Sequence, residues 1–270
     1  MSTRGPTAER PPLAVVTGAS SGLGLHIARR LAELGWDLVL SARSTEALEA
    51  LRSAVEVEFD VRAVVSVRDL SRDEGVRGLL ADVEALGRPV EMLVANAGFG
   101  LYGPYLDTDP DDEAAMLRVN VAAPVALVRG VLPDMVARDR GRILIVGSVG
   151  AFVPGPYTAT YYATRAFVVS YAEALAQELA GTGVTVTNLC PGPMPTGFQA
   201  RAGVRAEAAR FGALAPERVA RLGVRGALSG RRRVVPGFLA RTVPLLARLL
   251  PRTLLARIVG AAQSGRGAPN

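Results

Sequence analysis

One tyrosine and one arginine in this chain have the spacing that proton-transfer chemistry needs. Tyr161 and Arg165 are four residues apart in a segment with helical periodicity, so they share one face of the expected helix. A phenol has a pKa of about 10 and ionises usefully at neutral pH only beside a cation. The pair therefore indicates a general acid or base. The alternative is a buried core tyrosine, because Tyr157, Tyr162 and Tyr171 lie in the same segment.

A glycine-rich turn lies between the first expected strand and a helical pattern. Residues 17–24 read Thr-Gly-Ala-Ser-Ser-Gly-Leu-Gly. Small residues let the backbone approach a pyrophosphate, which the N–H groups and partial positive charge of a helix N-terminus attract. A tight connection without a ligand is the alternative. The turn in this context predicts a dinucleotide site, and the residues expected to hold the dinucleotide are Gly18, Ser20, Ser21, Gly22, Leu23 and Gly24.

The end of the second expected strand indicates which dinucleotide binds. An acidic residue there would bind both ribose hydroxyls of NAD and repel the 2′-phosphate of NADP. Residues 42–44 are Ala, Arg and Ser, so the acid is missing and Arg43 can grip that phosphate. A solvated loop arginine is the alternative for Arg43. We expect NADP, in its reduced form NADPH for a reductase.

Short β-branched runs alternate with amphipathic segments along the chain, a pattern typical of a parallel sheet covered on both faces. The expected strands are Leu13–Thr17, Asp37–Ser41, Arg62–Val67, Glu91–Ala95, Arg142–Val146, Val184–Leu189 and a short Arg232–Val235. The expected helices include Gly22–Leu34, Asp73–Leu86, Glu113–Arg138 and Tyr157–Ala180. We therefore predict an α/β, doubly wound, Rossmann-type sheet of about seven strands, with ligands beyond the strands' carboxyl ends.

The two ends of the chain differ in charge. Residues 1–200 hold 17 arginines and 23 acidic residues, whereas residues 201–270 hold 14 arginines and two acidic residues, and the whole chain is lysine-free. We expect residues 1–200 to form the dinucleotide-binding and catalytic part of the domain. Residues 201–270 should add an arginine-rich helical extension, and a substrate loop is expected from Thr196 to about Ala220.

The composition argues against several classes of protein. Cys190 is the single cysteine and His26 the single histidine, so an internal disulfide and the Cys/His spacing of a zinc site are missing, and we expect no metal. Cys190 is expected to be a small buried residue and His26 to be structural. The sequence has no apolar run of the roughly 18–20 residues that span a bilayer and no signal-peptide pattern at residues 1–12. We expect a cytoplasmic protein.

Several motifs, in the same order along the chain, resemble the short-chain dehydrogenase/reductase superfamily. They are the turn at 17–24, Asn96-Ala97-Gly98 after the fourth expected strand, Ser148 after the fifth, Tyr161 thirteen residues later and Pro191-Gly192-Pro193 after the sixth. The resemblance covers about residues 12–200. It implies an oxidoreductase that moves a hydride between a nicotinamide dinucleotide and a small carbonyl or secondary alcohol substrate. A homodimer or homotetramer is also expected.

The resemblance implies roles for four residues. Asn120 matches the asparagine that holds a water of the proton relay, Ser148 the serine that hydrogen-bonds the substrate oxygen, and Tyr161 the general acid or base. The fourth position is lysine in the family and Arg165 here. Arginine keeps the charge but spreads it over a plane, so turnover could be reduced. The alternative is a catalytically impaired dinucleotide-binding scaffold or sensor.

The resemblance also extends the cofactor site. Asp69 and Leu70 follow the third expected strand, where the family's aspartate accepts a hydrogen bond from the adenine amino group. Asp69 could equally cap the helix that begins near Ser71. The other residues that the resemblance places at the cofactor are Asn96, Ala97, Gly98, Tyr161, Arg165, Pro191, Gly192, Met194 and Thr196.

Residues 238–258 are leucine-rich and carry four interspersed arginines, at positions 241, 248, 252 and 257. One interpretation is a helical lid or a dimer surface. The other is an amphipathic anchor that contacts a membrane of anionic lipid peripherally, which would suit an apolar substrate. Nucleic-acid binding is not expected, because interleaved aromatic residues and a known binding module are missing.

Overall fold

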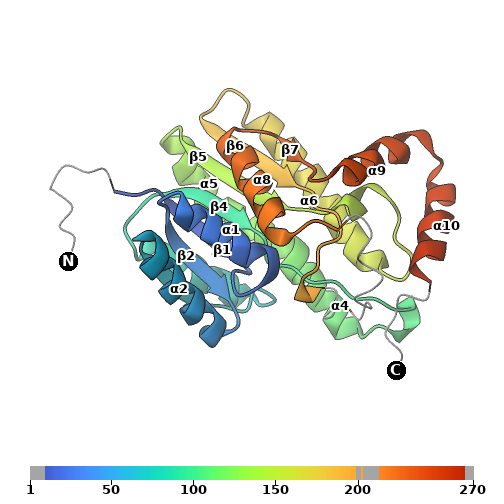
Figure 1. Cartoon of the computed structure of the whole chain (residues 1–270), viewed down its shortest axis with the longest axis horizontal. Coiled ribbons are helices and arrows are strands. Elements are labelled where there is room, and N and C mark those ends of the chain that lie inside the picture. Colours follow the sequence, from blue (N-terminus) through green and yellow to red (C-terminus); the bar gives the residue numbers. More distant parts are fainter. Residues whose placement is uncertain (1–9, 199–201, 203–212, 265–270) are drawn as a thin grey trace.

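The computed structural model describes residues 10–198, 202 and 213–264, and its centre is one parallel sheet (Figure 1). The strands are β1 (Leu13–Thr17), β2 (Asp37–Ala42), β3 (Ala63–Val67), β4 (Val90–Ala95), β5 (Gly141–Val146), β6 (Val184–Leu189) and β7 (Arg233–Val234). They lie in the order β3-β2-β1-β4-β5-β6-β7, and each neighbouring pair is parallel. The order reverses between β1 and β4, which opens a crevice at the carboxyl ends of these strands.

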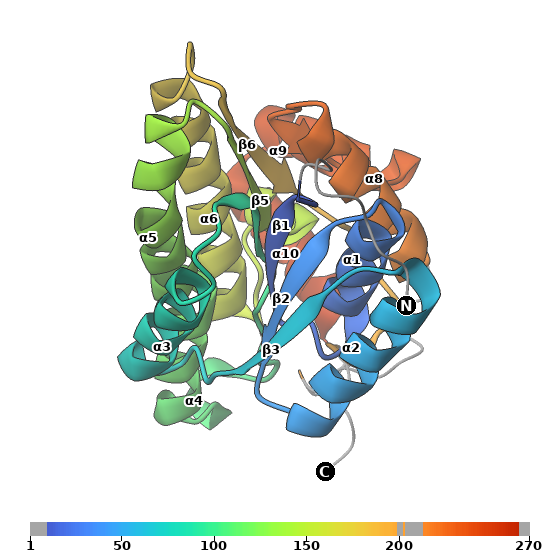
Figure 2. The same ribbon diagram turned by 90° about the vertical axis from the view of Figure 1, so that its left-hand side faces the viewer.

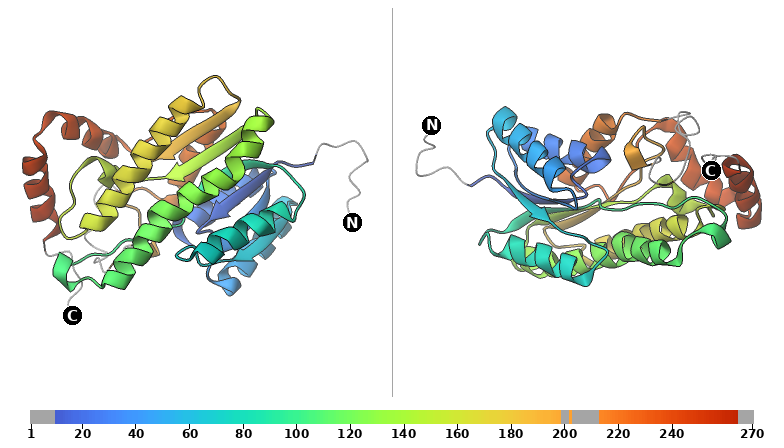
Figure 3. Two further views of the ribbon diagram at one scale, coloured as in Figure 1. Left: turned by 180° about the vertical axis from the view of Figure 1, so that it is seen from behind. Right: turned by 90° about the horizontal axis from the view of Figure 1, so that it is seen from below.

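Helices cover both faces of the sheet (Figures 2 and 3). They are α1 (Gly22–Glu33), α2 (Thr45–Phe59), α3 (Asp73–Glu84), α4 (Pro110–Leu117), α5 (Ala123–Ala137), α6 (Ala159–Glu178), α8 (Pro216–Leu228), α9 (Phe238–Leu249) and α10 (Arg252–Gln263), with short helical turns η1 (Tyr105–Asp107), η2 (Arg118–Ala122) and η3 (Val149–Phe152). Helices α1, α2 and α8 pack on one face, and α3, α5 and α6 on the other. The predicted doubly wound Rossmann-type fold is confirmed.

Side chains along β1 point alternately to the two faces of the sheet, which explains why the strands are apolar at every position. Ala14 and Val16 belong to the core under α1, α2 and α8, whereas Leu13 and Val15 belong to the core on the opposite face. Successive side chains of a strand point to opposite faces, so a strand covered on both sides buries all of them. The two cores hold the carboxyl ends of the strands, and therefore the crevice, in a fixed position.

Two expected helices differ in the structure. The helix expected at Glu113–Arg138 contains a π-helical turn, η2, between α4 and α5. The leucine-rich stretch is two helices, because Leu250 precedes Pro251 and adopts an extended backbone (φ −101°, ψ 143°). The proline ring disfavours the helical conformation for the residue before it. The chain therefore turns between α9 and α10.

One helical stretch meets the length and hydropathy expected of a membrane span, although the sequence was expected to contain none. Pro110–Ala137, which joins α4, η2 and α5, is long and apolar enough by those two measures. However, α5 buries Leu127, Val131 and Met135 against the sheet. The packing of α5 against the sheet therefore explains why this stretch is apolar.

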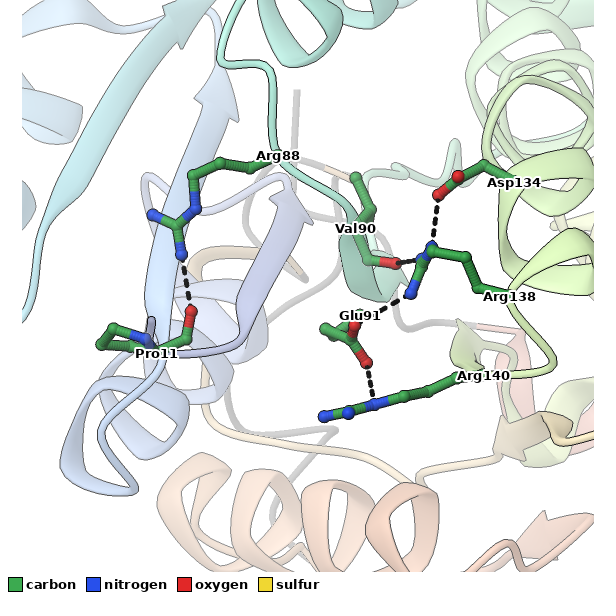
Figure 4. A network of polar contacts seen from close by, with 7 residues as sticks. All are labelled: Pro11, Arg88, Val90, Glu91, Asp134, Arg138 and Arg140. Carbon is green, nitrogen blue, oxygen red and sulfur yellow. Dashed lines mark hydrogen bonds and ion pairs between the residues drawn. The ribbon is translucent and has the colours of Figure 1, made fainter. Parts of the chain in front are cut away.

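Several arginines have structural roles at the end of the sheet opposite the crevice (Figure 4). Buried Glu91, the second residue of β4, pairs with Nη1 of Arg138 at 2.9 Å and with Nε of Arg140 at 2.7 Å. Arg88 donates to the carbonyl oxygen of Pro11, just before β1. Networks of this kind suit the guanidinium, whose several N–H donors can bond to different partners at once. Some of the arginines of this chain therefore stabilise the fold by joining segments at this end of the sheet.

Candidate active site

The glycine-rich turn forms a cradle at the carboxyl end of β1. Gly18 and Gly22 have positive φ angles of 65° and 56°, which residues with a side chain rarely adopt. A Cβ on Gly24 would lie 2.2 Å from the carbonyl oxygen of Gly18. The backbone therefore packs without room for side chains, directly before the N-terminus of α1. This geometry fits a pyrophosphate group.

Thr17 and Asn96 join this turn to the end of β4. The Thr17 hydroxyl accepts from the N–H groups of Asn96 and Ala97, at 3.0 Å each, and donates to the carbonyl of Val94. The Asn96 side-chain amide donates to the carbonyl oxygen of Thr17 at 2.9 Å. Asn96 therefore positions the turn. Thr17 is not among the residues predicted for the site, although its place at the end of a buried strand is a usable signal.

Arg43 lies exposed at the end of β2, beside the N-terminus of α2. It forms no ion pair within the part of the chain that the structure describes. Its charge acts on Asp69 at the end of β3: burial would raise the pKa of Asp69, but hydrogen bonds from Ser71 and the charges of Arg43 and Arg72 hold that pKa below its usual value. The end of β2 therefore presents an available cation where the sequence predicts a phosphate.

Asp69 and Leu70 have local roles in the structure. Oδ1 of Asp69 accepts from the backbone N–H and the hydroxyl of Ser71, at 3.0 and 2.8 Å. These bonds form a local turn before α3. Asp69 does not cap that helix as the sequence left open, because α3 begins at Asp73 and its N-cap residue, Arg72, makes no side-chain capping bond. Leu70 is buried in the core on that face.

Tyr161 and Arg165 lie against one another on α6. The Cζ atom of Arg165 is 5.0 Å from the centroid of the Tyr161 ring. Arg165 is only 5% exposed, and its Nη1 donates to the carbonyl oxygen of Val146, at the end of β5, at 3.0 Å. Its Nε is buried and has no hydrogen-bond partner among the described residues. The helix spacing thus brings a buried cation onto the phenol ring, as the sequence predicts.

Gly98 leaves the space that Arg165 needs. A Cβ at this position would lie 2.3 Å from Nη2 of Arg165 and 2.8 Å from Oδ1 of Asn120. The guanidinium therefore extends from α6 to the loop after β4. The structure brings together three of the predicted site residues here, from three segments far apart in the sequence.

Asn120 lies in the π-helical turn η2 and is 1% exposed. Its Nδ2 donates to the carbonyl oxygen of Phe99 at 2.9 Å and to the hydroxyl of Thr164 at 3.1 Å, while its Oδ1 accepts from the N–H of Phe99 at 3.1 Å. A π turn inserts an extra residue into a helix and is frequent at functional sites. Asn120 therefore links the loop after β4 to α6, beside Arg165.

Ser148 follows β5 and begins η3. Its hydroxyl oxygen accepts from the N–H of Gly150 at 3.1 Å. A serine hydroxyl that accepts one hydrogen bond still has its proton to donate. The position is half-buried and lies at the same end of the sheet as the glycine-rich turn. Ser148 can therefore donate to a substrate oxygen.

The segment after β6 closes over the crevice. A Cβ on Gly22 would lie 3.6 Å from Cβ of Thr196, and the carbonyl oxygen of Pro191 accepts from the N–H of Val149. The ring of Phe198 lies 5.5 Å from that of Tyr161. Phe198 is a neighbour of Tyr161 that the sequence analysis missed. Much of the predicted substrate loop, 199–201 and 203–212, lies outside the described residues.

Two hollows lie near Tyr161, and the C-terminal helix lines the outer one. A small pocket contacts Tyr161 and is lined in part by Tyr105 and Tyr157, which also line a cavity of about 470 Å³ beside α10. Buried Gln263 of α10 donates through its side-chain Nε2 to the hydroxyl of Tyr162 at 3.1 Å, and its backbone carbonyl oxygen accepts from the hydroxyl of Tyr102. No pattern in the sequence pointed to Gln263. The helix is thereby tied to the segment that carries Tyr161.

Cys190 and His26 lie outside this chemistry. Burial raises the pKa of the Cys190 thiol to about 12, so it is not a thiolate nucleophile at neutral pH. His26 pairs with Glu217 at 3.4 Å and joins α1 to α8. Across the described residues, no group of three or more His, Cys, Asp and Glu side chains could hold a metal ion.

Comparison with known proteins identifies the family. The family model described as short chain dehydrogenase matches residues 12–206. The chain belongs to the short-chain dehydrogenase/reductase superfamily. Sulfoacetaldehyde reductase 2 of Chromohalobacter salexigens is 35% identical to it over 188 residues, 69% of this chain and 74% of that protein. The matches span 54–74% of the length of three curated relatives.

Solved structures of other short-chain dehydrogenases have the same fold. One from Sphingobium yanoikuyae, in complex with NADPH, is 28% identical, with a TM-score of 0.80 and coverage of 88% of this chain and 93% of that one. One from Burkholderia phymatum, in complex with NAD, is 29% identical, with a TM-score of 0.77 and coverage of 88% and 92%. The oxidoreductase superfamily is therefore established for this chain, and a nicotinamide dinucleotide is the cofactor type that these two neighbours share.

Proposed function

We propose that this protein is an NADP-dependent oxidoreductase that exchanges a hydride with a carbonyl compound or secondary alcohol. The observation that carries the proposal is the contact of buried Arg165 with the ring of Tyr161, at the carboxyl ends of the strands. Arginines also contact the rings of Phe59 and Phe152, but among the described residues only Tyr161 combines a buried guanidinium with a phenol hydroxyl that can transfer a proton. The pair lies at the same end of the sheet as the glycine-rich turn.

The residues present fit an NADP molecule. Gly18, Gly22 and Gly24 leave the space for a pyrophosphate, and the N-terminus of α1 favours its charge. Arg43 would hold the 2′-phosphate, because it is exposed and lies where an acidic residue would select NAD. The dinucleotide, when bound, supplies or accepts the hydride at C4 of its nicotinamide.

The chain's own residues then handle the proton and the substrate oxygen. Tyr161 gives the proton of its hydroxyl to the oxygen during reduction and takes it back during oxidation. Ser148 donates a hydrogen bond to the same oxygen and stabilises the charge that develops there. Arg165 keeps a positive charge against the Tyr161 ring and would bind the ribose. Asn120 holds the loop after β4 in place through Phe99.

A scaffold or sensor without turnover is the second candidate, and one observation favours it. The Arg165 guanidinium is held by the carbonyl oxygen of Val146 and against Gly98. A side chain fixed in this way could be displaced by an ångström from the ribose and the phenol, which costs on the order of 10²-fold in rate. The protein would then still bind the dinucleotide but would not catalyse the reaction.

The test is NADPH consumption with a panel of aldehydes and ketones, alongside NADPH binding measured by the fluorescence of the cofactor. Consumption that depends on the carbonyl compound supports the oxidoreductase. Binding without consumption across the panel supports the scaffold. Failure to bind either NADPH or NADH overturns both. The cytoplasmic location and the homodimeric or homotetrameric state stay predictions from the sequence.

A further inference from the structure

Helix α9 turns an apolar stripe toward solvent. Phe238, Leu245 and Leu249 are exposed by 82%, 59% and 79%. At about 100° per residue, the three lie within about 40° of one another on the helix surface. Isolated exposed leucines are ordinary on soluble proteins, whereas several large exposed apolar residues on one side of a helix indicate an interaction surface.

Arginines flank this stripe on one side. Arg241 and Arg248 are exposed and, by the same helical geometry, lie about 60–80° from Phe238 in the same direction. Helix α10 repeats the arrangement, with exposed Leu254 and Ile258 beside Arg257. Each helix thus presents apolar residues next to guanidinium groups.

Acidic residues are missing from the last part of the sequence. Residues 218–270 contain 11 arginines and no aspartate or glutamate. Arg241 is bonded through its Nε to the carbonyl oxygen of Val235. Within the part of the chain that the structure describes, the four arginines of α9 and α10 form no ion pair. The surface therefore has an uncompensated positive charge.

The opposite sides of the two helices face the rest of the protein. On α9, Ala240 lies beside Gly192, where a Cβ would be 3.6 Å from the Ala240 Cβ. Leu255 and Gln263 of α10 are buried, and Gln263 bonds to Tyr162 of α6. In Figures 1 and 3 both helices lie at the end of the molecule away from α2. The outer sides of α9 and α10 therefore project from a fixed base.

We propose that this α9–α10 surface, the exposed sides of 238–249 and 252–263, binds a lipid surface that carries negative charge. The leucines and Phe238 would enter the boundary between headgroups and acyl chains, while the arginines pair with lipid phosphates. The proposal does not depend on the proposed reaction.

Charge favours lipid over two other occupants. A second copy docked through a two-fold axis would place the same arginines against one another, with no acidic residue from α9 or α10 between them. A nucleic acid would pair with the arginines but would leave the apolar stripe in water. An anionic bilayer satisfies both kinds of side chain at once.

The surface also adjoins the cavity beside the active site. Arg257 and Ala261, on the exposed side of α10, line the cavity of about 470 Å³ together with Tyr105 and Tyr157. Tyr157 in turn lines the pocket that contacts Tyr161. An apolar substrate dissolved in the lipid would thus meet the cavity at the docking surface.

The test is co-sedimentation of the full chain with vesicles of phosphatidylcholine alone or mixed with phosphatidylglycerol. The intact chain should pellet with the anionic vesicles at low salt and much less with the neutral ones, and salt should weaken the binding. The double variant Leu245→Glu/Leu249→Glu should lose binding by more than tenfold. Arg241→Gln/Arg248→Gln should weaken it by about 25-fold, from about fivefold for each arginine.

Matched controls lie on the other side of the molecule. Val57→Glu changes an 88% exposed residue of α2, and Arg62→Gln removes an exposed arginine before β3; both should bind vesicles like the intact chain. Melting temperatures should show that every variant is folded. Equal binding to neutral and anionic vesicles, or no binding at low salt, would overturn the proposal. The proposal would also be overturned if the intact chain did not bind vesicles but self-associated, and if Leu245→Glu/Leu249→Glu abolished that self-association.

Discussion

The guanidinium of Arg165 lies over the ring of Tyr161, with 5.0 Å between Cζ and the ring centroid. A second bond, from Nη1 to the carbonyl oxygen of Val146, fixes its orientation. The cation is therefore held between α6, the end of β5 and the loop after β4. In the family this position belongs to lysine, whose ammonium is a compact charge on a flexible stem. The position of the Arg165 guanidinium relative to the Tyr161 hydroxyl therefore determines the turnover rate that the site can support.

Arg165→Lys should raise turnover severalfold. The change keeps the charge, removes the buried Nε that has no partner among the described residues, and restores a compact ammonium. Arg165→Met, which keeps much of the bulk without the charge, is the control and should lose activity. Steady-state rates and pH–rate profiles of the three proteins check this. A loss in the lysine variant as large as in the methionine variant would show that the surroundings are built for the guanidinium.

Gly98→Ala should damage the site without unfolding the protein. The new Cβ would meet Nη2 of Arg165 at 2.3 Å and Oδ1 of Asn120 at 2.8 Å, so both must move. Displacement of about 1 Å can cost on the order of 10²-fold in rate. Val57→Ala, at an 88% exposed residue of α2 outside the site, is the control and should keep wild-type turnover. Wild-type turnover by Gly98→Ala would contradict the placement of these residues.

Cofactor choice should follow the end of β2. NADPH should bind at least about tenfold more tightly than NADH, a difference of about 1.4 kcal/mol. Arg43→Ala should narrow the difference, because the 2′-phosphate loses its cation, and Ala42→Asp should reverse it. Fluorescence titrations with both cofactors measure the ratio. Identical titration curves for the wild-type protein would refute the choice of NADP.

The Asp82 carboxylate should make stability depend on pH in the acid range. A bidentate bond from Arg68, at 2.9 and 2.7 Å, is the main cause that lowers the pKa of Asp82. A carboxyl group with a lowered pKa in the folded state stabilises the fold above its unfolded pKa, and this contribution fades as pH falls through the folded value.

Asp82→Asn should therefore lower the free energy of unfolding by about 1 kcal/mol at pH 7. The effect is small because the Arg68–Asp82 pair is partly exposed to solvent. The difference between variant and wild type should shrink below about pH 4. Urea unfolding of the variant and the wild type, at pH 7 and again below about pH 4, measures this difference in stability. A difference that is the same at both would show that the ion pair contributes nothing.

The strands and the site loops could be predicted because each depends on local sequence. Leu13–Thr17 and Val184–Leu189 are strands with the predicted bounds, since buried parallel strands are apolar at every position. Tyr161 and Arg165 meet because helical spacing alone brings residues i and i+4 together. The family resemblance, now confirmed, supplied the partners that are distant in sequence.

Contacts between distant segments could not be predicted. Nothing local indicates that Gln263 bonds to Tyr162, or that Phe198 lies beside Tyr161, because these contacts depend on how whole elements pack. The π turn at Asn120 was also missed, since a single extra residue leaves the apolar pattern of the helix almost unchanged.

The most direct test of the central claim is the rate of NADPH consumption by Tyr161→Phe, with a carbonyl compound that the wild-type protein reduces. The variant keeps the ring that contacts Arg165 and loses only the hydroxyl. Turnover should fall by about 10²–10⁴-fold, as expected when a general acid is lost, while NADPH affinity changes little. A Tyr161→Phe variant that turns over like the wild type would contradict the account, because the proton would then come from another group.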